Sequence, residues 1–409
     1  MPNGSAESDR PRLRPGLAAD AESDPGFVIL WDQLRITSEP LRLTLVEFAC
    51  VRLLNGQRTL RDVQAQAIAA VGGLIVPLDA IVKLLQRLDE SLFLHNDRFN
   101  CHLTGPDREP SCIGCYPAEP EKIRQQMRSL FTATGGPGLP GEPGCRIASE
   151  GRVRAVLVPH IDYARGGVTY GWGFKEIIER TDASLFVIIG TSHYSPERFT
   201  LTRKNFKSPF GKVETDQAFI NRLEAYYGEG LFNDPIAHLP EHSIELEVVP
   251  LQFLYEGKKP FRIVPLLVGS FGDCVQNGIF PNESDDIGRM IAALQQVEAE
   301  TKEPICYLIS GDLAHIGPKF DDPDPVAEPF LSESLSQDRA ILQRAEAADM
   351  KGYFEVIAAE QDCRRICGLP PTFTTLEVAQ PKRGKLLYYG RYVHPEGFES
   401  VSFASVAFE

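Results

Sequence analysis

The second half of the sequence alternates short apolar runs with helical segments, and this alternation restricts the fold more than any other feature. Segments such as 216–228 and 284–300 carry apolar residues at helical spacing. Between such segments lie four runs with the length of a buried strand: RVRAVLVP (152–159), SLFVIIG (184–190), FRIVPLLVG (261–269) and PICYLISG (304–311). This order is typical of an α/β domain. For residues 151–409 we predict a mixed or largely parallel sheet that is flanked by helices.

The first 150 residues divide into three predicted parts. Residues 1–25 are rich in Pro, Gly, Ser, Asp and Arg without periodicity, so we expect a disordered tail. Residues 26–105 hold three helical segments, one of which opens with Thr59 and Asp62 at capping-box spacing, followed by SLFLHNDRFN (91–100), which we interpret as a β wing. This order predicts a small winged-helix-like domain, with a helical cap on the main domain as the alternative. Residues 106–150 are interpreted as a linker that contains one amphipathic helix.

Composition and charge exclude several function classes. The 409 residues are 43% hydrophobic and 24% charged, as in ordinary globular proteins, and the net charge of -14 argues against a nucleic-acid or anionic membrane partner. No apolar stretch reaches the roughly 18 to 20 residues that span a bilayer, and the N-terminal residues lack the apolar segment of a secretory signal. The nine cysteines are scattered, as expected for reduced thiols. We therefore expect a cytoplasmic protein.

Histidines recur where the apolar runs end. His160 follows AVLVP, His193 follows FVIIGTS and His315 follows ICYLISGDLA, whereas His242 begins an apolar segment. In open α/β sheets, ligands bind in the crevice beyond the carboxyl ends of the strands. We predict that these imidazoles share one crevice, in which small residues allow a substrate or metal to approach the backbone.

Carboxylates accompany these histidines. Asp312 precedes His315 by three residues, and Glu241 and Glu245 flank His242. Neutral imidazoles with a nearby carboxylate suit Fe(II), copper or zinc, and a carboxylate can also orient an imidazole through its other nitrogen. A single histidine after a strand is usually an ordinary loop residue, but four such positions in one domain favour a shared site.

Five motifs in this order resemble the Memo family: VPHIDYARGGVTYG (158–171), IIGTSHY (188–194), PEHSIELEVVPLQFL (240–254), SGDLAHIG (310–317) and CGLPPTFTTLEVA (367–379). The segment CYPAEPEKIRQQM resembles the family's opening, so the resemblance covers about residues 112 to 409. It implies a fold similar to that of the class III extradiol dioxygenases, which hold non-haem Fe(II) with two histidines and a glutamate. Residues 26–105 resemble the PqqD-like peptide-binding domains.

The resemblance also implies a metal site. His160 in PHIDY and His193 in TSHY match the family's two metal histidines, and some members add a cysteine. Alignment of ESVSFAS (399–405) with the family's last strand places Val393 or His394 at that cysteine, and His394 is the predicted third ligand.

The resemblance also implies further site residues, because His242, Asp312 and His315 match site-lining positions of the family. We predict catalytic roles for His242, Asp312 and His315, with His242 or His315 as the acid or base near an unperturbed pKa of about 6.5. The other predicted pocket residues are Asp162, Ser192, Glu241, Glu245 and Cys367.

The implied function is that of a metal-binding, dioxygenase-like oxidoreductase. Fe(II) is the expected metal, with copper or zinc as alternatives. The resemblance implies an AMMECR1-like protein and a radical SAM enzyme as partners, and a small molecule or a peptide as substrate. The alternative is a non-catalytic binding scaffold that retains the pocket.

Three weaker signals remain. Cys112 and Cys115 form a lone CxxC, which serves metal or redox chemistry or is merely a pair of loop thiols. Cys367 is expected at a turn beside the pocket, where a nucleophilic role is the less favoured interpretation. The GTSHY segment lacks the second glycine of a GxSxG nucleophile elbow, so hydrolysis is disfavoured.

Overall fold

The computed structural model describes residues 10–22, 24–37 and 39–409, which form two compact units. Unit 1 is Met1–Ser111 and unit 2 is Cys112–Glu409. The described residues contain no helix that is long and apolar enough to cross a membrane.

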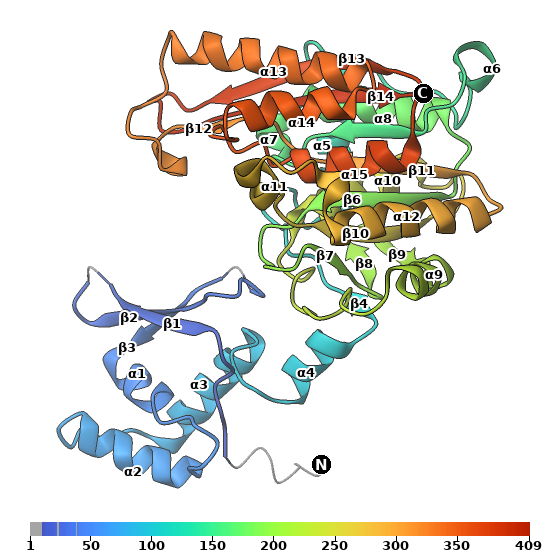
Figure 1. Ribbon diagram of the computed structural model, residues 1–409. Coiled ribbons are helices and arrows are strands. Elements are labelled where there is room, and N and C mark those ends of the chain that lie inside the picture. The colour runs from blue at the N-terminus through green and yellow to red at the C-terminus, as the bar shows by residue number, and fades with distance from the viewer. Residues whose placement is uncertain (1–9, 23, 38) are drawn as a thin grey trace. The chain divides into compact units, whose positions relative to one another are not determined.

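Unit 1 begins with a three-stranded antiparallel sheet in the order β1-β2-β3, and helices follow it (Figure 1). Its core is apolar and centred on Leu43, Val63 and Leu88, which have no exposed surface. The elements are β1 (Leu17–Ala21), β2 (Phe27–Asp32), β3 (Leu41–Thr44), α1 (Leu45–Val51), α2 (Leu60–Ala70), α3 (Leu78–Glu90), α4 (Asp97–Thr104) and the two-residue β4 (Asp107–Arg108).

Local sequence fixes where the helices of unit 1 begin. Thr59 accepts a hydrogen bond from the Asp62 N–H, and the Asp62 carboxylate accepts one from the Thr59 N–H, so the predicted capping box of α2 is confirmed. Thr44 and Glu47 form the same arrangement at α1. Each box satisfies backbone donors that a helix start leaves unpaired.

Unit 1 differs from the sequence prediction at both ends. Strand β1 lies inside the segment expected to be a disordered tail. Its sequence LAADA favours a strand only weakly, and the strand forms because it pairs with β2 through backbone hydrogen bonds. Residues 1–9 of that predicted tail lie outside the described residues. The expected wing at 91–100 is instead a turn followed by α4, because the Asn96 side chain caps α4 by accepting from the Phe99 N–H. The three-stranded sheet of this unit therefore precedes its helices.

Unit 2 is built on a mixed sheet with a parallel centre. Strands β5, β11, β6 and β10 are adjacent in that order and parallel, and β14 joins β5 antiparallel, which confirms the predicted fold class. The strands are β5 (Ala155–Val158), β6 (Leu185–Thr191), β7 (Phe199–Leu201), β8 (Asn205–Ser208), β9 (Gly211–Thr215), β10 (Arg262–Val268), β11 (Ile305–Ser310), β12 (His315–Ile316), β13 (Gly384–Val393) and β14 (Ser400–Phe408).

Helices cover both faces of this sheet. Successive side chains of a strand point to opposite faces, and because both sets are apolar, each face needs helices to bury it. In β6, Val187 and Ile189 pack in one core with α9, α12 and α15, whereas Phe186 and Ile188 pack in a second core with α5, α8 and α10. The helices are α5 (Pro120–Thr132), α6 (Ile147–Glu150), α7 (Tyr163–Gly166), α8 (Val168–Arg180), α9 (Gln217–Tyr227), α10 (His242–Tyr255), α11 (Gly272–Asn277), α12 (Asp285–Glu300), α13 (Phe330–Glu346), α14 (Met350–Ala359) and α15 (Leu369–Ala379), with 3-10 turns η2 (Pro281–Glu283) and η3 (Pro318–Phe320).

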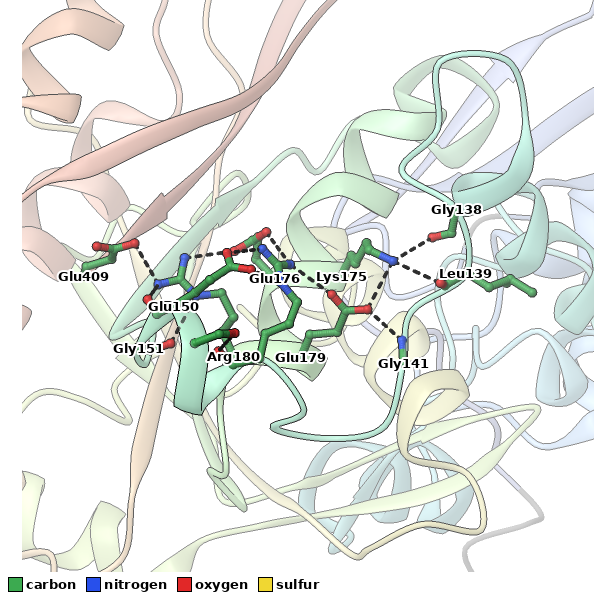
Figure 2. A network of polar contacts seen from close by, with 12 residues as sticks. Gly138, Leu139, Gly141, Glu150, Gly151, Lys175, Glu176, Glu179, Arg180 and Glu409 are labelled. Carbon is green, nitrogen blue, oxygen red and sulfur yellow. Dashed lines mark hydrogen bonds and ion pairs between the residues drawn. The ribbon is translucent and has the colours of Figure 1, made fainter.

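The Gly- and Pro-rich segment before β5 is held against α8 by polar contacts (Figure 2). Lys175 Nζ donates to the Leu139 carbonyl (3.0 Å), and the Gly141 N–H donates to Glu179 (2.7 Å). Arg180, which is buried, pairs with Glu176 on its own helix and with Glu409 (2.7 Å). This stretch of the predicted linker is thus part of unit 2.

Candidate functional site

The ends of the central strands bring the predicted residues to one edge of the sheet. His160 lies two residues after β5, Asp312 two residues after β11, and His193 two residues after β6. Because β5, β11 and β6 are parallel neighbours, their carboxyl ends meet at the same edge. The sequence argument for a common crevice therefore agrees with the arrangement of these strands.

Three imidazoles form the centre of the site. The ring centroids of His160 and His193 are 5.0 Å apart, those of His160 and His242 5.2 Å, and those of His193 and His242 4.7 Å. His242 comes from the first residue of α10, so a helix start joins the two strand ends. One ligand atom from each of the three side chains lies within 4.8 Å of the others, which is close enough for the three to share a metal ion.

Glu241 orients two of these rings. Its Oε1 lies 2.9 Å from His193 Nδ1 and 3.2 Å from His242 Nδ1, while its Oε2 accepts from the His193 N–H at 2.8 Å. Burial raises the pKa of Glu241, but the charges and hydrogen bond of the histidines outweigh it and hold that pKa well below its usual range. Burial likewise lowers the pKa of His193, and Glu241 reverses the shift, so the net change is upward. With both Nδ1 atoms engaged, Nε2 is the nitrogen through which each ring would bind a ligand.

His160 belongs to a second group of potential ligands, with Asp312 and Cys367. Its Nε2 lies 3.3 Å from Cys367 Sγ and 3.7 Å from Asp312 Oδ2. Burial and the two neighbouring histidines lower the pKa of His160 well below its usual value, so the ring is neutral. Burial, with the Asp312 charge, raises the pKa of the Cys367 thiol well above its usual value.

The structure corrects the prediction of a third ligand at His394. Neither group of potential ligands found among the described residues includes His394. Its Nδ1 accepts from the Glu396 N–H (3.2 Å) in the turn between β13 and β14, so the ring caps that turn. A cysteine does reach the site: Cys367, on the segment before α15, places its Sγ beside His160 Nε2.

The predicted acid–base roles also change. Burial lowers the pKa of His315 to about 4, and its Nδ1 lies 3.1 Å and 3.0 Å from the carbonyl oxygens of Leu313 and Arg365, so this ring is a neutral anchor. Burial raises the pKa of Asp312 to about 7, although the backbone N–H groups of His160 and Ile161 oppose that shift. The pKa of Asp312 therefore lies near neutral pH, where this carboxyl group can gain or lose a proton.

Sequence reasoning missed the support beneath His160. Ser310 Oγ lies 3.4 Å from His160 Nδ1 and donates to Glu247 Oε1 at 2.8 Å. Glu247 is fully buried, its Oε2 has no hydrogen-bond partner among the residues that the structure describes, and burial raises its pKa well above the usual value. A neutral Glu247 thus holds Ser310, which faces the side of His160 opposite Cys367. A glutamate inside the apolar run ELEVVPLQFL was the available signal.

The remaining predicted pocket residues have different roles. Asp162 caps α7 by accepting from the Arg165 N–H (3.1 Å). Glu245 accepts hydrogen bonds from the Cys112 N–H (3.1 Å) and the Tyr116 hydroxyl, which are distinct from the histidine cluster. Ser192 lines a cavity of about 210 Å³ together with Cys367, so this cavity gives a substrate room beside the second ligand group.

The small residues beside the histidines accommodate protein atoms. A Cβ at Gly190 would lie 2.6 Å from Ser243 Oγ, and one at Gly311 would lie 2.5 Å from the Gly368 Cα. The expectation that these glycines admit a ligand is therefore corrected, because neighbouring segments of the chain occupy that space. Gly311 and Gly368 let the segment that carries Cys367 pack directly on the end of β11.

Fold and site together define a class: an α/β protein whose parallel strands end in a histidine pocket that can hold a metal ion. The chain belongs to the Memo family, because its residues 108–407 match the family model described as Memo-like protein.

Relatives support this assignment over most of the chain. A MEMO1 family protein of Aquifex aeolicus is 25% identical over 384 residues, which cover 91% of this chain and 93% of the relative. A MEMO1 family protein of Methanopyrus kandleri is 26% identical over 74% of this chain and 99% of its own length, and one of Thermus thermophilus is 26% identical over 81% and 93%. The Aquifex alignment is longer than unit 2, so it extends into unit 1.

Proposed function

We propose that this protein is a metal-dependent oxidoreductase that binds a late first-row metal at the histidine pocket, with Fe(II) first and copper or zinc as alternatives. The observation that carries the proposal is the convergence of His160, His193 and His242, whose ligand atoms lie within 4.8 Å of one another. Three imidazoles with adjacent carboxylate and thiol groups suit these metals rather than Mg²⁺ or Ca²⁺.

The supporting contacts fit such an ion. Glu241 engages Nδ1 of His193 and His242, and Ser310 lies beside Nδ1 of His160. Metal-binding histidines typically hydrogen-bond one ring nitrogen to the protein in this way and bind the metal with the other. Cys367 and Asp312 face His160 Nε2, so nitrogen, oxygen and sulfur donors are all within reach of one position. A bound redox metal would supply electron transfer and polarise a substrate oxygen.

The chain's own groups would manage the protons of the reaction. Asp312, with its pKa raised to about 7 by burial, exchanges a proton beside His160 at the pH of a cell. His315 remains neutral and fixes the backbone of Leu313 and Arg365. The cavity lined by Ser192 and Cys367 would take a small molecule or the end of a peptide side chain.

Partners and location belong to the same proposal. The Memo resemblance supports an AMMECR1-like protein and a radical SAM enzyme as partners, and a PqqD-like unit 1 would present a peptide. The net charge of -14 and the scattered cysteines support a cytoplasmic protein without a nucleic-acid or membrane partner. A scaffold that uses the pocket only for binding is the second candidate, because the pair of Glu241 with His193 holds part of the site without a metal.

Metal analysis tests the proposal. Protein reconstituted anaerobically with Fe(II) should hold one metal ion per chain, and His160→Ala and His193→Ala should each lose it. His394→Ala is the matched control, because its ring caps a turn, and it should retain the metal.

Oxygen consumption with substituted catechols and with the products of the partner enzymes then tests turnover. Metal-free wild type, or equal metal content in all four proteins, would contradict the metal site. Stoichiometric metal with no turnover on any of these substrates would contradict the oxidoreductase and leave the scaffold.

A further inference from the structure

The CxxC segment at the start of unit 2 closes a tight turn. The Cys115 N–H donates to the Cys112 carbonyl at 2.9 Å, and Gly114 supplies a φ of +118° at the third position. A turn closed in this way holds its first and fourth Cα atoms within about 7 Å. A disulfide needs Cα atoms roughly 4.4 to 6.8 Å apart, so this turn holds the two cysteines near bonding range.

The two thiols interact and differ in accessibility. A hydrogen bond from the Cys112 side chain lowers the pKa of Cys115, whereas burial raises the pKa of Cys274 to about 11 and that of Cys306 to about 12. Cys112 is buried, Cys115 is half-buried, and Ile113 at the turn is 47% exposed. A small reagent would therefore meet Cys115 first, with Cys112 behind it.

Neighbouring contacts hold the turn in place. The Cys112 N–H and the Tyr116 hydroxyl both donate to Glu245, and Gln126 donates to the Cys115 carbonyl (3.2 Å). Glu245 lies on α10, three residues after His242. A turn that is fixed on both sides of the cysteine pair keeps the sulfurs together in the reduced state, which favours ring closure over reaction of either thiol alone.

We propose that Cys112 and Cys115 are a redox-active dithiol that exchanges with low-molecular-weight disulfides such as oxidised glutathione. The Cys115 thiolate attacks one sulfur of the small disulfide, forms a mixed disulfide and releases one thiolate. The Cys112 thiolate then attacks the Cys115 sulfur, forms the Cys112–Cys115 bond and releases the second thiolate. The protein loses two protons and two electrons, and the small disulfide gains the electrons as two thiols.

The test equilibrates the full-length protein in buffers of increasing oxidised-to-reduced glutathione ratio and maps its cysteines by peptide mass spectrometry. Wild type should form the Cys112–Cys115 disulfide, with the loss of two hydrogen atoms, and reduced glutathione should reverse it. Cys112→Ser should instead accumulate a mixed disulfide at Cys115. Cys115→Ser should leave the buried Cys112 as an unmodified thiol.

The exposed Cys101, Cys145 and Cys363 serve as internal controls for non-specific reaction. The proposal is wrong if Cys112 and Cys115 stay reduced in buffers that modify these three residues, or if the two serine variants react alike while their circular dichroism matches wild type. His160→Ala should form the same disulfide, so this outcome is independent of metal binding.

Discussion

The two sides of the histidine pocket are stabilised in opposite ways. On the α10 side, Glu241 is ionised and pairs with His193 and His242, whose side chains are 30% and 29% exposed. On the β5 side, His160 and Asp312 are buried beside the half-buried Cys367, and burial favours the neutral form of all three. Glu241 is itself buried, so the difference shows that a buried carboxylate ionises where imidazoles compensate its charge, whereas the β5 side requires a compensating cation before it ionises.

Asp312→Asn should give the largest effect on this comparison. Because the pKa of Asp312 is raised to about 7, the folded wild type binds an extra proton between pH 4 and 7, and its stability falls as pH rises through that window. Asparagine does not ionise, so the variant should avoid this loss of unfolding free energy, which is about 4 kcal/mol at most. Urea midpoints of metal-free protein from pH 4 to 8, followed by Trp172 fluorescence, should show the variant gaining on wild type as pH rises. A pH-independent difference would show that Asp312 ionises normally.

Glu241→Gln tests the charged side. The amide keeps the shape but loses the negative charge and one of the two acceptor oxygens, so the pKa of His193 should fall. We expect metal affinity to drop about 10- to 100-fold. Competition with a chromophoric chelator measures the affinity, and proton NMR of the histidine rings measures the pKa. An unchanged metal affinity together with a lowered His193 pKa would contradict the prediction, because it would show that metal binding does not depend on the charge of Glu241.

Glu247 offers the smallest and most selective change. Glutamine in its place keeps the acceptor for Ser310, and because the pKa of Glu247 is raised, Glu247→Gln should match wild type at pH 4 and exceed it at pH 7. Ser310→Ala removes the link to His160 and should cost about 1 kcal/mol at both pH values. Paired urea unfolding at the two pH values distinguishes them. Equal behaviour of both variants would contradict a neutral Glu247 that supports His160 through Ser310.

The sequence predicted the parts of the site that depend on local pattern. Apolar runs of strand length followed by a histidine place His160 and His193 correctly at the ends of β5 and β6, because parallel strands share one edge. Cys367 was underestimated because its segment reaches the site only through tertiary contacts: the Gly368 N–H donates to the Asp312 carbonyl (2.8 Å), and the His315 N–H to the Arg364 carbonyl (2.7 Å). No local spacing encodes such contacts.

Unit 1 shows the same limit on a smaller scale. The helix starts at Thr44 and Thr59 depend on residues three positions apart and are readable from the chain. Strand β1 depends on its partner β2, since its own residues favour a strand only weakly. Pairing between segments, rather than the composition of either one, decides the outcome.

The backbone contact between Gly311 and Gly368 restricts which sequences can keep this site. A methyl group at position 311 would lie 2.5 Å from the Gly368 Cα, and one at position 368 would lie 2.7 Å from the Asp312 carbonyl oxygen. Either addition would force the two segments apart and lengthen the gap between thiol and imidazole. The position of the Cys367 sulfur relative to His160 thus depends on two glycines that contribute no side chain, and a substitution at either one would displace the sulfur.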